Sequence, residues 1–61
     1  MFTGDQVEII ASWSQVQGKQ AKVKVVELDH GEVGEVVVEV EGMDPLFRFR
    51  FSIDEVTLHP D

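Results

Sequence analysis

The sequence predicts an all-β domain that folds as one small barrel of five strands over residues 1–61. Apolar and polar residues alternate in "VVVEVE" (36–41) and "LFRFRFS" (46–52), and a period of two is that of a strand with one buried face. These runs are rich in β-branched and aromatic residues, which favour strands. No segment carries the apolar stripe of a helix of about ten residues or more.

The first strand is expected over residues 5–11, with Val7 and Ile9 facing the core. A loop that holds Trp13 follows it and ends at Gly18. This loop has no regular hydrophobic period, so its conformation is not predicted in detail.

The second strand is expected over residues 20–28. Its apolar residues change face between Val25 and Val26, so we expect either a β-bulge there or a bend around a barrel corner. The segment "DHGEVG" (29–34) contains two glycines and predicts the turn that follows.

The third and fourth strands, 35–41 and 46–52, are expected to form a hairpin around "GMDP" (42–45). Next, "SIDE" (52–55) predicts one short helical turn, and the last strand is expected over 56–59 because Pro60 stops it. Closure of the five strands into a barrel would remove exposed edges and bury one face. The expected core is Val7, Ile9, Val23, Val25, Val36, Val38, Val40, Phe47, Phe49, Phe51, Val56 and Leu58.

Two registers of this hairpin satisfy the pattern. With Glu41 opposite Leu46, Glu39 faces Arg48; a shift by two residues pairs Glu41 with Arg48 and Glu39 with Arg50. Both registers bury phenylalanine against valine and pair opposite charges, and each such contact contributes roughly 0.2–1 kcal/mol. A slip by one residue would turn the arginines inward, so the parity of the pairing is defined.

Composition limits the functions that this chain can have. A chain of 61 residues buries only about 60% of its unfolded surface, so we expect one small core without a deep enzyme cleft. The sequence contains no cysteine, which suits a reducing, cytoplasmic location, and it shows neither a signal peptide nor an apolar run of membrane-spanning length. The net charge of −7 disfavours nucleic acid and favours a neutral or basic partner.

Three segments resemble known families of small barrels. "GDQVEII" (4–10) and "GKQAKVKVVE" (18–27) resemble the KOW pattern of SH3-like domains in ribosomal and transcription-elongation proteins, although Ala21 replaces the usual glycine. "FRFSIDEVTLHP" (49–60) resembles the last strands of small barrel subunits in photosynthetic electron transfer. The resemblance implies an SH3-like five-stranded barrel that either contacts RNA or docks onto a larger protein complex.

The only tryptophan lies in "ASWSQVQGK" (11–19), and it admits two interpretations. Trp13 either contacts a protein partner, since tryptophan is enriched in binding hot spots, or closes an end of the core. In the first case we expect Val16 and Ile10 to extend an apolar patch around it. A second apolar option lies on the predicted turns, at Val33 and Met43.

The basic residues define an alternative, nucleic-acid-binding face. The five are Lys19, Lys22, Lys24, Arg48 and Arg50. A patch of these residues would suit RNA or the ribosome. The competing interpretation pairs the arginines with Glu39 or Glu41 and uses the lysines to keep a strand soluble. A homo-oligomer joined through a strand edge is a third hypothesis.

We expect no enzyme activity, cofactor or metal. The serines do not lie in a nucleophile motif, and the glycines do not form a phosphate-binding loop. His30 and His59 do not have the spacing of a metal-ligand motif, even with Asp29 or Asp61 as further ligands. The leading prediction is therefore a non-catalytic protein-interaction module or small accessory subunit.

Overall fold

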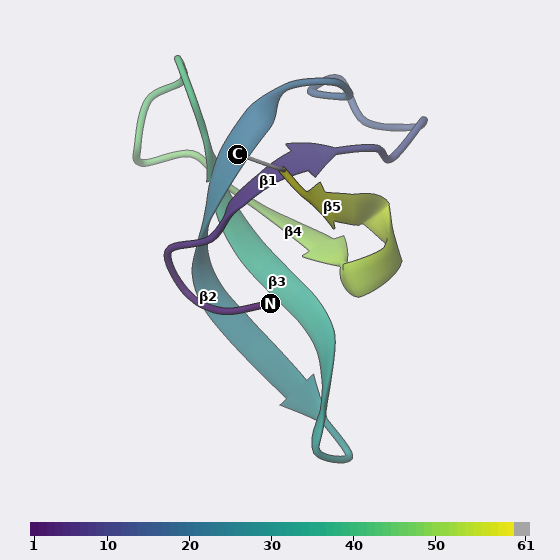
Figure 1. The fold of residues 1–61 in the computed structure, drawn as a ribbon. Helices are drawn as coiled ribbons and strands as arrows, with labels where there is room; N and C mark the ends of the chain where they lie inside the picture. The colour runs from purple at the N-terminus through teal and green to yellow at the C-terminus, as the bar shows by residue number, and fades with distance from the viewer. Residues whose placement is uncertain (60–61) are drawn as a thin grey trace.

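The structure is a computed structural model that describes residues 1–59. Five antiparallel strands form one sheet in the order β4-β3-β2-β1-β5 (Figure 1). The elements are β1 (Gln6–Ile9), β2 (Gln20–Asp29), β3 (Glu32–Val40), β4 (Arg48–Ser52), the 3₁₀ turn η1 (Ile53–Glu55) and β5 (Val56–Leu58). The predicted all-β fold, with one short helical turn before the last strand, is confirmed. Pro60, which we expected to end that strand, lies outside the described residues.

The predicted barrel is not confirmed, because the sheet is open. Within residues 1–59, β4 pairs only with β3 and β5 pairs only with β1, so these two strands are the edges of the sheet. η1 joins the end of β4 to the start of β5, and the two strands share no hydrogen-bonded register. Both edges therefore keep unpaired backbone groups.

β2 and β3 form a long hairpin whose tip extends beyond the rest of the sheet (Figure 1). The predicted turn lies within 29–34 but is shorter than expected, because β2 continues to Asp29 and β3 begins at Glu32. Only His30 and Gly31 form the turn, and both have positive φ, at 52° and 82°. Two central residues with positive φ are the signature of the type I′ turn, whose twist matches that of the flanking strands.

A β-bulge at Lys24 switches the face of β2, as one of the two alternatives predicted. The register passes from Val23 opposite Val38 to Val25 opposite Val37, which leaves Lys24 as the extra residue. The switch lies one residue before the expected position. It turns Val25 outward and exposes it, so the prediction of Val25 as a core residue was wrong.

A second irregularity lies near the hairpin tip. Glu27 pairs with Glu35 and Leu28 with Val33, so Gly34 is the extra residue of β3. A Cβ atom added to Gly34 would lie 3.2 Å from the Asp29 Cβ atom, which is closer than ordinary van der Waals contact. The bulge returns Val33 to the core side, where it is partly buried.

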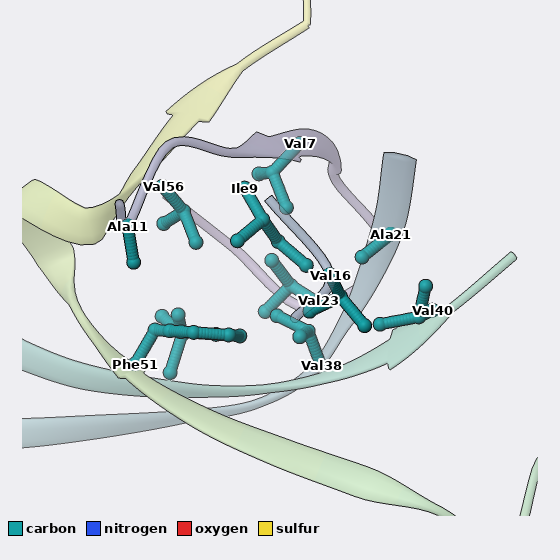
Figure 2. Packing of buried hydrophobic residues seen from close by; sticks show 11 residues of the cluster. Val7, Ile9, Ala11, Val16, Ala21, Val23, Val38, Val40, Phe51 and Val56 are labelled. Carbon is teal, nitrogen blue, oxygen red and sulfur yellow. The ribbon is translucent and has the colours of Figure 1, made fainter. Parts of the chain in front are cut away.

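The β3–β4 pairing selects the first of the two predicted registers. Val36 lies opposite Phe51, and Glu39 lies opposite Arg48. The core consequently lies on one face of the sheet, where the side chains of β1, β2, β3, β4 and β5 meet (Figure 2). Its members are Val7, Ile9, Ala11, Val16, Ala21, Val23, Val36, Val38, Val40, Phe51 and Val56. Phe49 packs partly buried against this cluster.

Two further core predictions were wrong. Phe47 is 59% exposed because β4 begins only at Arg48; the Asp44 carboxylate accepts the N–H of Leu46 at 2.9 Å, and the Asp44 carbonyl accepts that of Phe47 at 2.9 Å. Phe47 therefore belongs to a turn and not to the strand alternation. Leu58 is also exposed, because it is the last residue of a three-residue edge strand.

A pair of phenylalanine substitutions tests this assignment of the core. Phe51 is 1% exposed, so Phe51→Ala should lower the free energy of unfolding by about 3–5 kcal/mol, which is comparable to the whole stability expected of so short a chain. Phe47→Ala should lower it by less than about 1 kcal/mol. Urea denaturation followed by circular dichroism measures both. Equal losses in the two variants would contradict the assignment.

Candidate interaction site

The loop between β1 and β2 is a chain of short turns that is anchored by Val16. Backbone N–H groups of Ser14, Gln17 and Lys19 each donate to the carbonyl three residues earlier, and the N–H of Gly18 donates to the Ile9 carbonyl at 2.7 Å. The Val16 side chain is only 4% exposed and points into the core (Figure 2). Because both its ends and its centre are fixed, the loop holds Trp13 in a defined place.

Trp13 packs on the core with one side and remains exposed on the other. Its ring centroid lies 5.6 Å from that of Phe51, with the ring planes inclined by 38°. Its indole Nε1–H donates a hydrogen bond to Glu55 Oε2 at 2.6 Å. The side chain is nevertheless 68% exposed. The two interpretations of Trp13 are therefore compatible: it covers Phe51 and also presents a large aromatic surface.

Glu55 connects this loop to η1. Its second carboxylate oxygen, Oε1, accepts the backbone N–H of Ser52 at 2.8 Å, and the two residues form a capping box. Its carbonyl accepts the backbone N–H of Ile10 at 2.9 Å. The hydrogen bond from the Ser52 backbone, followed by that from Trp13, holds the pKa of Glu55 below its usual value of 4.5.

The sequence signal for Glu55 was partial. A serine followed three residues later by a glutamate predicts the capping box. The bond to Trp13 spans 42 residues of sequence, and no local pattern indicates it.

Of the two residues predicted to extend an apolar patch around Trp13, one is exposed and the other is buried. Ile10 is 45% exposed, and its backbone N–H donates to the Glu55 carbonyl, so its predicted role as a contact residue stays a prediction. Val16 is buried, so its predicted role as a partner-binding residue was wrong; the turns of the loop direct it inward. Val33 and Met43, the second apolar option, are partly buried against the core.

The predicted basic face carries acidic side chains among its basic ones. Lys24 Nζ lies 3.3 Å from Glu39 Oε2. Arg50 lies 2.9 Å from Glu27 and 3.6 Å from Glu35, which are acids other than those predicted to pair with it. Within residues 1–59, three basic residues make no ion pair: Lys19, Lys22 and Arg48. These pairings mix both signs of charge over the outward face of β2, β3 and β4.

Neither histidine belongs to a cluster of potential metal ligands in the described part of the chain. His30 lies at the β2–β3 turn, 3.5 Å from Asp29. His59 Nε2 lies 3.0 Å from the side-chain nitrogen of Gln20. Asp61, the other ligand considered from the sequence, lies outside the described residues.

No protein-family model matches this sequence, and comparison with curated proteins and with solved structures found no significant match. The resemblance to SH3-like domains therefore stays a prediction from the motifs quoted above. Within residues 1–59, no helix is long and apolar enough to cross a membrane.

Acid should release the contact between Trp13 and Glu55. Since the folded-state pKa of Glu55 is lowered, the stability that its carboxylate contributes is present above pH 4.5 and is lost as the pH falls through the lowered value. Glu55→Gln should therefore reduce the loss of stability between about pH 5 and about pH 3. Denaturant titrations followed by Trp13 fluorescence measure this loss.

Asp54→Asn is the matched control, because Asp54 is an exposed neighbour in η1 whose carboxylate makes no hydrogen bond among the described residues. The control should keep the acid sensitivity of the wild type. An identical pH profile for the wild type and the Glu55→Gln variant would show that the contact does not contribute.

Proposed function

We propose that this protein is a non-catalytic interaction module, or a small accessory subunit, that docks onto a larger protein through the exposed side of Trp13. The observation that carries the proposal is the state of this ring: it is 68% exposed, yet Glu55 and Phe51 fix its position. A contact residue that is already ordered loses little conformational entropy on binding. Tryptophan is also among the residues most enriched in hot spots.

The chemistry around the ring suits an apolar partner surface with basic groups at its margin. Ile10 is exposed and its backbone N–H donates to the Glu55 carbonyl, while the carboxylate of Glu55 lies next to the ring. The whole chain carries a net charge of −7, which favours association with a basic surface and speeds the encounter. The partner that we propose therefore places an apolar group against Trp13 and lysine or arginine beside it.

The fold supports a module of the SH3-like class. The strand order β4-β3-β2-β1-β5, the long loop after β1 and the 3₁₀ turn before β5 agree with the arrangement expected of an SH3-like barrel. Because one fold supports many functions, this agreement bears on the architecture and not on the identity of the partner.

The alternative, a KOW-like contact with RNA or the ribosome, has less support. Two of the five basic residues, Lys24 and Arg50, are already paired with acids of the same face. A phosphate backbone would have to approach these acids as well, at an electrostatic cost.

Replacement of Trp13 by alanine should weaken partner binding by at least about tenfold, since loss of a hot-spot residue costs about 2 kcal/mol or more. Trp13→Phe should retain part of the binding, because it keeps an aromatic ring over Phe51. Affinity capture from a lysate of the source organism, followed by titration of the captured protein, measures the effect.

Phe2→Ala is the matched control, since Phe2 is another highly exposed aromatic residue, and it should leave binding unchanged. Circular dichroism checks that each variant is folded. A folded Trp13→Ala variant that binds normally would contradict the proposal. If the protein captures lysate components that are lost after nuclease treatment, the result would favour the RNA alternative instead.

A further inference from the structure

Within residues 1–59, the outer edge of β4 (Arg48–Ser52) pairs with no other strand. β4 is hydrogen-bonded to β3 on one side only and stands at the end of the sheet. In an antiparallel strand, alternate residues turn their N–H and C=O groups away from the paired neighbour. These groups of β4 are free to accept another strand.

The side chains of this edge present different chemistry on its two faces. Phe49 lies on the core face, where it is only partly buried, and it stacks 6.3 Å from Phe51. Phe47, just before the strand, is 59% exposed, and Leu46 is 87% exposed. Arg48 and Arg50 lie on the opposite, outward face. A strand added here would cover apolar area on one face and meet arginine on the other.

Within residues 1–59, Arg48 has no acidic partner, although acids outnumber bases twelve to five in the sequence. Glu39 lies opposite Arg48 in the register, but its carboxylate is bound by Lys24 from the other side. Arg50, by contrast, is held by Glu27 and Glu35. The unpaired guanidinium at the edge thus favours a negative group from another molecule.

A second copy of this chain fits the edge poorly. The fullest antiparallel pairing of two β4 strands is centred on Arg50, the middle residue of the strand, and sets the Arg50 side chains of the two copies opposite each other. Like charges directly opposite one another in a sheet are destabilising. The arginines therefore protect the edge against self-association, which is a common use of charge on edge strands.

We propose that the β4 edge binds an extended segment of a partner protein in which acidic side chains alternate with apolar ones. The segment adds to the sheet as a sixth strand. Its carboxylates lie beside Arg48, and its apolar side chains cover Phe49. This surface is separate from the one at Trp13 and has the opposite preference for charge.

A short peptide of defined sequence tests this proposal. The probe is blocked at both ends and alternates glutamate with valine and threonine; a matched peptide replaces each glutamate by lysine. Isotope-labelled protein is titrated with each peptide, and amide hydrogen exchange is followed by NMR. We expect the glutamate peptide alone to bind and to slow exchange at amides of β4. Methylation of alternate backbone nitrogens of the peptide should abolish binding, because strand addition requires those donors.

Two variants separate the edge from general electrostatics. Arg48→Glu should weaken binding by roughly threefold to tenfold, since an opposite-charge cross-strand pair becomes a like-charge pair. Lys22→Glu makes the same change of charge on an exposed residue of β2, within the sheet, and should leave the affinity unchanged.

Three outcomes would overturn the proposal. These are equal weakening by both variants, no binding of the glutamate peptide at about millimolar concentration, and a dimer of the protein alone, by light scattering, with protected β4 amides. Trp13→Ala should leave this titration unchanged. The test therefore fails or succeeds independently of the docking surface proposed at Trp13.

Discussion

The structure depends on the burial of one aromatic ring. Phe51 is the largest fully buried side chain in a core made mainly of valine, and aromatic residues bury more area than any other kind. It pairs with Val36 across the β3–β4 register, and Trp13 packs against it. Phe51 lies near the end of β4, just before η1. Trp13 of the β1–β2 loop packs on Phe51 and binds Glu55 of η1, so burial of Phe51 brings the loop and η1 together.

Trp13 completes this packing without itself becoming buried. The hydrogen bond to Glu55 satisfies its one polar atom, and the contact with Phe51 covers one side of the ring. The capping box with Ser52 orients the glutamate. An exposed aromatic side chain is thereby held in one orientation by residues of two distant segments. Such preorganisation reduces the entropic cost of binding and is the physical basis of the proposed function.

Features set by neighbouring residues could be predicted from the sequence, and features set by distant contacts could not. Alternation located the strands, fixed the parity of the β3–β4 hairpin and revealed the face switch next to Val25. The exposure of Phe47 was missed because the turn formed by Asp44 interrupts the alternation before β4 begins. The burial of Val16 and the bond between Trp13 and Glu55 follow from tertiary packing, for which no local pattern exists. The site was therefore predicted as Trp13 with Ile10 and the buried Val16, without the contacts that hold the ring.

The central claim is that Trp13 is held in place while its ring remains accessible. The most direct measurement is the rate of solvent exchange of the Trp13 indole hydrogen, by NMR, in the wild type and in the Glu55→Gln variant. The account predicts slow exchange in the wild type, because the hydrogen is engaged by Glu55, and clearly faster exchange in the variant. Exchange in the wild type as fast as that of a free indole would contradict the claim.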